Sequence, residues 1–336
     1  MNARIIAEAG VNHNGSLALA KQLAEQALEA RADYVKFQTF VPALLAASTA
    51  QTAAYQQANT GDGSQLEMLR ALSLSFDDFR ALKAHCDRIG IAFLSTPFDM
   101  ASLAFLGTLG MPFWKVPSGE ITNLPYLLAI AQTCLPVVLS TGMCTLAEVG
   151  EALDALRGHG TDDVTLLHCT TQYPTPMADV NLRAMETLRQ RFHVPVGYSD
   201  HTEGITVPVA AAALGAVVIE KHFTLDRGMK GPDHKASLEP QELGAMVRAV
   251  RDVEQALGDG EKAPRASERG NLAVARKSIV AAEPLCRGTV LEARHLTTKR
   301  PGSGVSPMRW FDVIGRKANR DYRADEMIDD EVWQDV

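Results

Sequence analysis

Val196-Gly-Tyr-Ser-Asp-His-Thr202 and Val217-Val-Ile-Glu-Lys-His-Phe223 are short apolar runs that each end in polar residues. Their length and composition predict two β-strands. Side chains alternate between the faces of a strand, so each histidine shares a face with the polar residue two positions before it. If the strands are neighbours, the imidazoles of His201 and His222 converge, and two neutral imidazoles suit a divalent metal ion that keeps open positions for water and substrate. The alternative is that one or both histidines are hydrogen-bonded residues of the core.

Strand-like and helix-like segments alternate along the chain up to and around these two runs. Eight β-α units in about 255 residues match a (β/α)8 TIM barrel better than a six-stranded doubly wound sheet. No G-x-G-x-x-G motif follows the first strand, so a dinucleotide-binding fold lacks its main support. The predicted strands are Ile5–Ala9, Tyr34–Gln38, Ala92–Thr96, Phe113–Val116, Pro136–Ser140, Val164–His168, Val194–Tyr198 and Val217–His222. The predicted helices are Leu17–Ala30, Phe76–Ile89, Met100–Leu109, Leu124–Thr133, Leu146–Arg157, Leu182–Arg191, Ile205–Leu214 and Gln241–Leu257.

Polar side chains gather where the predicted strands end. In a barrel of this kind the functional groups lie at the C-terminal ends of the strands, so we expect these side chains to share one mouth. They are Glu8, Lys36, Gln38, Thr96, Lys115, Ser118, Glu120, Ser140, Thr141, His168, Thr170, Thr171, His201 and His222.

Two segments depart from the alternation. Phe40–Ser75 is too long for an ordinary loop, and its Ala, Gln, Thr and Gly-rich middle, Gln51–Gly63, predicts either a mobile lid over the barrel mouth or a disordered surface insertion. After Leu257 the composition changes. We therefore predict a catalytic barrel over residues 1–258, a linker over 259–275 and a small β-rich domain over 276–336, with strands at Ser278–Ala282 and Thr289–Leu291. A domain of this size has a marginal core and needs a larger neighbour.

Bulk composition narrows the class of protein. A net charge of −7 argues against nucleic acid as the main partner. No apolar run approaches the roughly 18 residues that span a bilayer, so we expect no membrane partner. Five cysteines without a C-x-x-C spacing indicate reduced thiols. The N-terminal residues show no signal-peptide pattern, so we expect a cytoplasmic location.

Two lysines on the predicted strands suggest an anion site. A lysine that points into a barrel is costly unless it meets an anion, and Lys36 and Lys115 are placed to meet the same one. Hydroxyl groups nearby would complete a phosphate or carboxylate cradle. The alternative is that the two lysines pair structurally with Glu8 and Glu120. The candidate hydroxyl groups are those of Thr96, Ser118 and Ser199.

Carboxylates complete the expected chemistry. Glu8 is a candidate acid/base or hydroxyl-binding residue, and Asp233 is a second carboxylate near the expected metal. Glu220 is predicted to support His222 from behind or to form an ion pair in the barrel core. His13 is predicted to be a surface or turn residue without a role. An anion cradle, an open metal site and acid/base groups at one mouth predict carbon–carbon bond chemistry on a phosphorylated or carboxylated small molecule, with the metal polarising a carbonyl.

Several motifs together resemble the N-acetylneuraminate (sialic acid) synthase family, which includes legionaminic and pseudaminic acid synthases. The resemblance covers nearly the whole chain, in the family's order. The segment Lys299-Arg-Pro-Gly-Ser-Gly304 is similar to the family's C-terminal antifreeze-like (SAF) domain. The barrel motifs are Ala7-Glu-Ala-Gly-Val-Asn-His-Asn-Gly15, Val35-Lys-Phe-Gln-Thr39, Ser95-Thr-Pro-Phe98, Lys115-Val-Pro-Ser-Gly-Glu120, Leu167-His-Cys-Thr170, Tyr173-Pro-Thr-Pro176, Ser199-Asp-His-Thr202 and Glu220-Lys-His-Phe-Thr224.

This resemblance implies a transferase that condenses phosphoenolpyruvate (PEP) with N-acetylmannosamine or a related N-acylated sugar. It implies a divalent ion, usually Mn²⁺ and otherwise Mg²⁺ or Co²⁺, held by His201 and His222. Glu8 matches the family's proposed catalytic carboxylate. Arg300 matches an arginine that reaches the active site of the other subunit, which implies a domain-swapped homodimer. The PEP contacts map to Lys36, Thr96, Lys115, Ser118, Thr171 and Ser199, and sugar or metal-shell positions map to Gln38, Tyr173 and Asp233.

One departure leaves the sugar open. The residue that matches Thr171 is commonly Asn in the sialic acid branch, and the run Thr170-Thr-Gln-Tyr173 is nearer to relatives that make legionaminic-type acids. The alternative substrate is therefore a 2,4-diacetamido-trideoxyhexose. Two further alternatives are a metal-independent Schiff-base aldolase that uses Lys36, Lys115 or Lys221, and a carbohydrate-binding protein without turnover.

Overall fold

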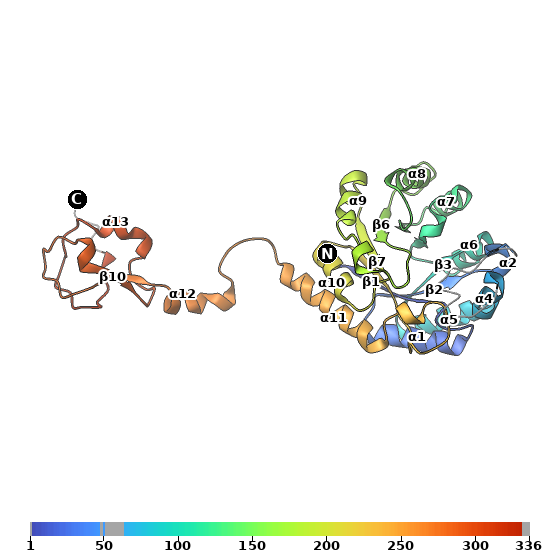
Figure 1. Cartoon of the computed structure of the whole chain (residues 1–336), viewed down its shortest axis with the longest axis horizontal. Coiled ribbons are helices and arrows are strands. Elements are labelled where there is room, and N and C mark those ends of the chain that lie inside the picture. The colour runs from blue at the N-terminus through green and yellow to red at the C-terminus, as the bar shows by residue number, and fades with distance from the viewer. Residues whose placement is uncertain (1, 48–49, 51–63, 331–336) are drawn as a thin grey trace. The chain divides into compact units, whose positions relative to one another are not determined.

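The computed structural model describes residues 2–47, 50 and 64–330. The chain separates into two compact units, Met1–Gly258 and Asp259–Val336 (Figure 1). Within the described part of the chain, no helix combines the length and the apolar character needed to cross a bilayer.

The first unit is an eight-stranded, all-parallel barrel, as predicted. Its hydrogen-bonded strand order is β3-β2-β1-β8-β7-β6-β5-β4, and β3 and β4 are in contact where the ring closes. The strands are β1 (Arg4–Gly10), β2 (Tyr34–Thr39), β3 (Ala92–Pro97), β4 (Trp114–Val116), β5 (Val137–Ser140), β6 (Val164–Cys169), β7 (Val196–Asp200) and β8 (Val218–His222). The helices that follow them are α1 (Leu17–Glu29), α5 (Phe76–Ile89), α6 (Met100–Gly107), α7 (Leu124–Ala131), α8 (Leu146–Arg157), α9 (Ala184–Phe192), α10 (Thr206–Ala213) and α11 (Pro240–Leu257).

Local sequence explains why these helices begin and end where they do. Helix α5 begins at a capping box in which Ser75 accepts from the Asp78 backbone N–H, and it ends at Gly90, whose φ of 90° is left-handed and easiest for glycine. The predicted insertion contributes two helices to the structure, α2 (Pro42–Leu45) and α4 (Gln65–Leu72). Its expected flexible middle, residues 51–63, lies outside the described residues.

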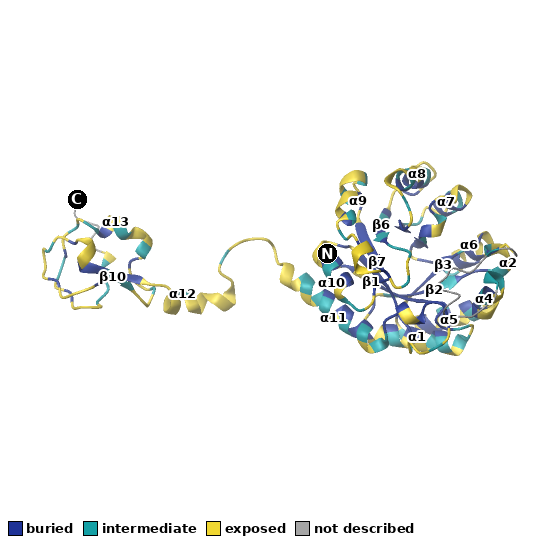
Figure 2. Ribbon diagram, in the orientation of Figure 1, coloured by how far each residue is buried: buried dark blue, intermediate teal, exposed yellow. Residues whose placement is uncertain are grey.

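The strands of the barrel are largely buried, whereas the surrounding helices combine buried and exposed residues (Figure 2). The larger apolar cluster fills the space between the strands and the surrounding helices, while a second cluster lies inside the ring. The inner cluster comes from the first inward-facing position of several strands, such as Ile6 on β1 and Val218 on β8. Since side chains alternate, the next inward positions on these strands are Glu8 and Glu220. The interior is therefore apolar at the N-terminal end and polar at the C-terminal mouth. The inner cluster is Ile6, Leu94, Phe113, Val138, Leu167 and Val218.

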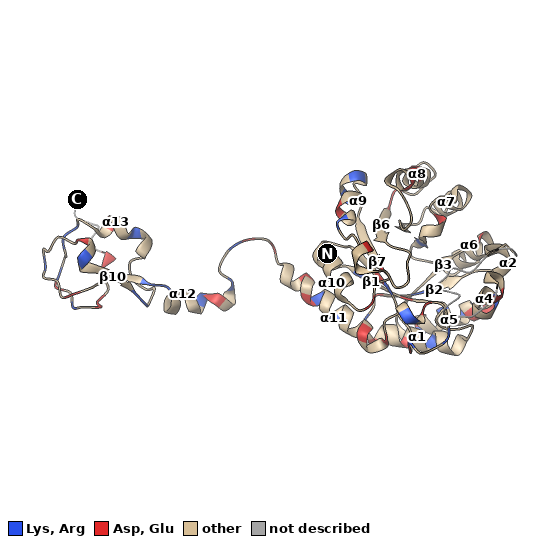
Figure 3. Ribbon diagram, viewed as in Figure 1, with Lys and Arg blue, Asp and Glu red and all other residues tan. Residues whose placement is uncertain are grey.

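The first and last elements of the barrel unit are tied together. Strand β1 pairs with β8, and Arg251 on α11 donates to the Ala3 carbonyl at 2.7 Å and pairs with Asp33 at 2.9 Å. Glu254 accepts from the Ala3 backbone N–H at 2.5 Å. Elsewhere basic and acidic residues occur together on the outer helices, α9 and α11 among them (Figure 3).

The second unit has its own apolar core. It contains α12 (Arg269–Ala275), an antiparallel pair of β9 (Ser278–Ala281) and β10 (Leu296–Lys299), and α13 (Trp310–Val313). Helix α12 occupies the last part of the expected linker. The strand predicted at Thr289–Leu291 is wrong: after the left-handed turn at Gly288 only Val290 makes a bridge, and the partner of β9 is instead the more polar β10. The core residues are Ile279, Ala281, Leu285, Leu291, Leu296, Val305, Val313, Ala318, Tyr322 and Ile328.

Candidate active site

A cavity of about 240 Å³ opens at the C-terminal mouth of the barrel. Twelve of the thirteen residues that the family resemblance assigns to the site line it. The thirteenth, Arg300, lies in the second unit, where its Nε donates to the Ala275 carbonyl at 3.1 Å. The twelve are Glu8, Lys36, Gln38, Thr96, Lys115, Ser118, Thr171, Tyr173, Ser199, His201, His222 and Asp233. Of the fourteen polar residues expected at the mouth from the strand ends, four do not line it: Glu120, Thr141, His168 and Thr170.

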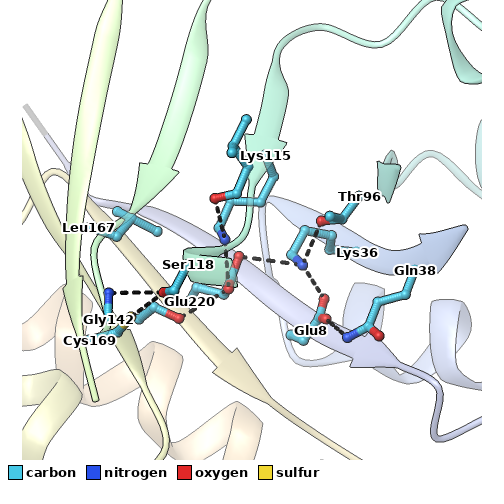
Figure 4. Close-up of polar contacts among 12 residues, drawn as sticks. Glu8, Lys36, Gln38, Thr96, Lys115, Ser118, Gly142, Leu167, Cys169 and Glu220 are labelled. Carbon is cyan, nitrogen blue, oxygen red and sulfur yellow. Dashed lines mark hydrogen bonds and ion pairs between the residues drawn. The ribbon is translucent and has the colours of Figure 1, made fainter. Parts of the chain in front are cut away.

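The floor of the cavity is a buried group of four charges, the interior ion cluster of Glu8, Lys36, Lys115 and Glu220 (Figure 4). Lys36 Nζ lies 2.8 Å from Glu8 Oε2 and 3.7 Å from Glu220 Oε2. Lys115 Nζ lies 3.5 Å from Glu220 Oε1. Glu220 thus takes the place expected for Glu120, whose carboxylate instead accepts from an asparagine amide at 2.6 Å in the turn after β4.

Burial and neighbouring charges set the protonation of this cluster. Burial acts most strongly on the pKa of Lys36, lowering it, but the carboxylates of Glu220 and Glu8 outweigh it and leave that pKa raised. For Glu220, burial is again the largest effect, and the two lysines overcome it and lower its pKa. For Lys115 and Glu8, burial outweighs the neighbouring charges. It lowers the pKa of Lys115 and raises the pKa of Glu8. One lysine is held as a cation, and one carboxyl is close to accepting a proton.

Hydroxyl groups surround the cluster. Thr96 Oγ1 accepts from Lys36 at 3.2 Å, and Ser199 Oγ donates to Glu220 at 3.1 Å. Ser118 Oγ accepts from the Gly142 backbone N–H at 2.9 Å. Gly142, which the sequence did not single out, is required here, because a Cβ at this position would lie 2.7 Å from Thr171 Cγ2 and 2.9 Å from Ser118 Oγ. Its backbone turns past the cavity where a side chain cannot fit.

The two histidines converge as predicted. Their ring centroids are 5.4 Å apart. His201 Nδ1 lies 2.6 Å from the Thr170 carbonyl, which favours the Nδ1–H tautomer and leaves a lone pair on Nε2, 3.0 Å from the Tyr173 hydroxyl. His222 Nδ1 is buried, makes no hydrogen bond among the described residues and lies 3.9 Å from Asp233 Oδ2.

Both imidazoles are neutral near pH 7. Burial lowers the pKa of His201 to about 4, and burial together with the charge of His201 lowers that of His222 well below its usual range. Neutral rings with available lone pairs are what a transition-metal ion requires. No group of three or more His, Cys, Asp or Glu residues in the described chain is arranged to hold a metal. The donors that the described residues offer at this point are the two imidazoles, whose ring centroids are 5.4 Å apart.

Acid/base candidates lie beside the histidines. Glu8 is the register partner of His222 across β1 and β8, and Gln38 Nε2 donates to Glu8 Oε1 at 2.9 Å. Burial, reinforced by Glu8, raises the pKa of Asp233 to about 7. Two carboxyl groups whose pKa values burial raises thus lie beside the imidazole pair.

Lys221 points away from this site. It is fully buried on the outer side of the ring, with Nζ 2.5 Å from Asp200 Oδ2 and a second hydrogen bond to the Thr202 carbonyl. This outer ion pair of Asp200 and Lys221 leaves no route for Lys221 to reach a substrate, so only Lys36 and Lys115 remain as Schiff-base candidates.

Two features escaped the sequence analysis. Helix α4 of the insertion contributes Met68, Leu69 and Leu72 to the cavity. His13 is buried in the turn after β1, and burial lowers its pKa to about 4. An apolar i, i+3/i+4 pattern at residues 68, 69 and 72 was the available signal for a packed helix in the insertion.

Comparison with family models matches residues 23–262 to the NeuB family and residues 276–331 to the SAF domain. The chain belongs to the NeuB family. The family and the SAF domain expected from the motifs are both confirmed.

Relatives of this NeuB family member cover almost all of its length. It is 50% identical over 327 residues to the N,N'-diacetyllegionaminic acid synthase of Campylobacter jejuni, spanning 96% of this chain and 98% of that protein. It is 37% identical to the human N-acetylneuraminate-9-phosphate synthase, spanning 98% and 92% of the two chains. Among solved structures, the sialic acid synthetase of Leptospira borgpetersenii in complex with citrate has a TM-score of 0.70 at 34% identity and covers 81% of this chain and 90% of that one.

Proposed function

We propose that this NeuB family member condenses PEP with an N-acylated amino sugar to give a nine-carbon 2-keto acid and inorganic phosphate. The interior ion cluster is the observation that carries the proposal. Two buried lysines share one floor with incompletely paired carboxylates and lie beside two neutral imidazoles in a single cavity. An anionic three-carbon donor would give both lysines further charge-assisted contacts, beyond the 3.5–3.7 Å contacts that they make with Glu220. The names of the legionaminic and sialic acid synthase relatives support the same reaction class.

The bond changes follow from these positions. C3 of PEP forms a bond to the sugar aldehyde carbon, whose oxygen takes up a proton. Water adds to C2, and the C2–O bond to phosphate breaks, which leaves the 2-keto group. Lys36, Lys115 and the hydroxyl groups of Thr96, Ser118, Thr171 and Ser199 would hold the phosphate and carboxylate. Glu8 is placed to exchange a proton with the aldehyde oxygen or the water.

His201 and His222 would hold a divalent ion, with Mn²⁺ the first candidate and Mg²⁺ or Co²⁺ the others. When bound, such an ion polarises the aldehyde as a Lewis acid. Gln38, Tyr173 and Asp233 lie on the cavity wall within reach of the sugar hydroxyl groups. The five cysteines, none of them in a disulfide, support a reducing cytoplasm as the site of action.

For the acceptor we favour a 2,4-diacetamido-trideoxyhexose over N-acetylmannosamine. By the resemblance, Thr171 matches a position that is commonly Asn in the sialic acid branch. Relatives at 50% and 46% identity are named N,N'-diacetyllegionaminic acid synthases. A threonine hydroxyl can still donate one hydrogen bond, so PEP binding is retained.

A domain-swapped homodimer is part of the proposal. The small unit carries Arg300 exposed, together with the apolar side chains of Met308 and Phe311, which are 92% and 86% exposed. If Arg300 serves a second copy, Arg300→Ala raises the KM of the sugar more than that of PEP. Equal changes in the two constants, or full activity of a chain ended after Leu257, would contradict this role.

A phosphate-release assay with PEP, Mn²⁺ and a panel of hexosamine-derived sugars tests the reaction. We expect release that depends on the sugar and stops with a chelator. The Schiff-base alternative predicts the reverse: covalent trapping by borohydride with pyruvate, and activity without metal. No release with any sugar of the panel would favour a binding protein.

A further inference from the structure

The turn that follows β1 carries the run Val11-Asn-His-Asn-Gly15, whose polar side chains the proposed function does not use. Asn12 is buried and Asn14 is half-buried, and neither lines the cavity. Asn14 has a left-handed φ of 49°, a conformation that Asn tolerates better than most residues. Both asparagines contact residues 223–238, the segment that follows β8, which we call the β8 loop.

The two ends of the β8 loop are fixed by backbone hydrogen bonds. The Leu238 N–H donates to the His222 carbonyl at 2.9 Å, and the Thr224 N–H donates to the Leu238 carbonyl at 2.9 Å. Asp233 lies between these ends, and its carboxylate oxygen is 3.9 Å from His222 Nδ1. Pairing at the ends of the loop does not fix Asp233, so its position depends on contacts with the rest of the barrel.

Asn12 provides the first of these contacts. Its Nδ2 donates to the Phe223 carbonyl at 2.8 Å and to Ser237 Oγ at 3.0 Å. Ser237 Oγ in turn donates to the Asp233 carbonyl at 2.7 Å. All three hydrogen bonds are buried, where a donor or acceptor left without its partner is costly. This chain therefore fixes the backbone of Asp233 relative to the end of β8.

Asn14 provides the second contact, to the residue after Asp233. Its Oδ1 lies 3.2 Å from Nε2 of the fully buried His234, whose Nδ1 lies 2.7 Å from Thr224 Oγ1. This approach requires Gly231, since a Cβ there would lie 2.6 Å from His234 Cδ2 and 2.9 Å from Asn14 Oδ1. The imidazole of His234 thus connects the β1 turn to the start of the β8 loop, with Asp233 next to it in the chain.

Resting on the proposed synthase activity, we propose that Asn12 and Asn14 are positioning residues that hold Asp233 beside the two histidines. A carboxylate in this place orients an imidazole or a water on a bound divalent ion, and outer partners of this kind contribute about 10- to 100-fold to metal affinity or activity. The lysines of the proposed PEP site lie on other strands, β2 and β4. A displaced β8 loop should therefore affect the metal and the sugar more than PEP.

A double-mutant cycle on the full-length protein tests whether the Asn12 contact acts through Asp233. Ser237→Ala breaks the link to the Asp233 carbonyl, and Ser237→Thr, which keeps the hydroxyl group, is the matched control. We expect Ser237→Ala to raise the KM of the sugar and the Kd of Mn²⁺ about 10-fold each, and Ser237→Thr to restore both. The KM of PEP should change less than about 3-fold in either variant. In an Asp233→Asn background, which already lacks the carboxylate, Ser237→Ala should cause no further loss.

Asn14→Gly tests the second contact without straining the backbone, since glycine adopts a left-handed φ readily. Arg31→Gly is its control, because Arg31 is an exposed residue with a left-handed φ of 61° after α1. Only Asn14→Gly should raise the Kd of Mn²⁺ and the KM of the sugar. Equal effects in the two glycine variants, or a full additional loss from Ser237→Ala in the Asp233→Asn background, would overturn the inference.

The Kd of Mn²⁺, measured from the electron paramagnetic resonance signal of the free ion, needs no substrate, so the inference and the synthase reaction fail separately. If no sugar gives phosphate release but Ser237→Ala still weakens Mn²⁺ binding, the synthase proposal is removed and the positioning role stands. Phosphate release with an unchanged sugar KM and an unchanged Kd of Mn²⁺ in Ser237→Ala and Asn14→Gly would overturn the positioning role alone. Absence of Mn²⁺ binding by the wild type would overturn it as well.

Discussion

Strand β8 contributes to two groups of buried charges on its opposite faces, with Glu220 in the interior ion cluster and Lys221 in the outer ion pair. In the outer ion pair, Asp200 accepts from the Thr202 N–H at 3.1 Å and from its hydroxyl at 3.0 Å, and Lys221 contacts both Asp200 and a backbone carbonyl. In the interior ion cluster, the contacts of Glu220 with the two lysines are 3.7 and 3.5 Å, and its Oε2 makes no hydrogen bond among the described residues.

We infer from this difference that the outer ion pair stabilises the fold and that the interior ion cluster serves the proposed PEP site. Removing one member of a buried ion pair is strongly destabilising, because the charge of the other member is left buried without compensation. A cluster with loose contacts and an open side can exchange partners when an anion arrives. Adjacent residues on one strand, such as Lys221 and His222, are therefore expected to have different roles, one in stability and one in activity. Substitutions can test this assignment.

His222→Ala should give the largest effect on turnover and a small one on stability. We expect kcat to fall at least about 1000-fold, since a metal ligand supplies several kcal/mol of transition-state stabilisation. The free energy of unfolding should change by less than about 1 kcal/mol, because the ring already leaves Nδ1 unpaired. Phosphate release and urea unfolding measure the two quantities. Near-full activity would remove the metal site from the proposal.

Lys221→Met should show the opposite pattern. Removing one member of the outer ion pair leaves Asp200 buried without its cation, which costs about 3–5 kcal/mol of unfolding free energy. The double variant Asp200→Leu/Lys221→Met, which removes both charges, should recover most of that loss. In both variants, the KM of PEP measured on the folded fraction should equal that of the wild type. A fully stable single variant would contradict the assigned division.

Lys36→Met places the same substitution on the interior ion cluster. The loss of a charge-assisted contact to an anion predicts a fall in kcat/KM for PEP of about 100-fold. Stability should suffer less than in Lys221→Met, since burial already raises the pKa of Glu8 and this carboxyl can take up a proton. The unfolding free energies of Lys36→Met and Lys221→Met, measured side by side at pH 7, test this. An equal or larger loss in Lys36→Met would contradict the prediction.

His13 gives a smaller, pH-dependent effect away from both charge groups. Burial lowers its pKa from 6.5 to about 4, so the folded chain binds fewer protons there than the unfolded chain between these values. Its contribution to stability is therefore fully present above pH 6.5 and is lost as the pH falls towards 4, by roughly 3 kcal/mol. His13→Gln should flatten the wild-type profile of unfolding free energy over this interval. Parallel profiles for the two proteins would contradict the effect.

The barrel and its floor could be predicted because both follow from alternation along strands. An apolar strand that ends in a polar residue places that residue at the mouth, and this rule located Glu8, His201 and His222. Contacts across the ring could not be predicted in this way. The pairing of Lys115 with Glu220 depends on how β4 and β8 face each other once the ring closes, which residue spacing does not encode. The position of α4 depends on packing against loops that are distant in sequence.

In the small unit, composition and turn signals did not predict the strands correctly. The predicted strand at Thr289–Leu291 has the right composition but only one bridge, and the polar Leu296–Lys299 supplies the strand instead. In a unit with a small core, strand pairing depends more on turn geometry, here at Gly288, and on which segment lies beside β9 than on composition.

The register partnership of Glu8 with His222 also has a consequence for biosynthesis. During translation the first strand emerges early, but its neighbour β8 and the latch of Arg251 onto Ala3, separated by 248 residues, emerge only near the end of the barrel. A nascent chain that ends before β8 therefore lacks the hydrogen-bonding partner of one edge of β1 and the Arg251 contact. Such a chain also lacks His222, so it cannot form the pairing of Glu8 with His222.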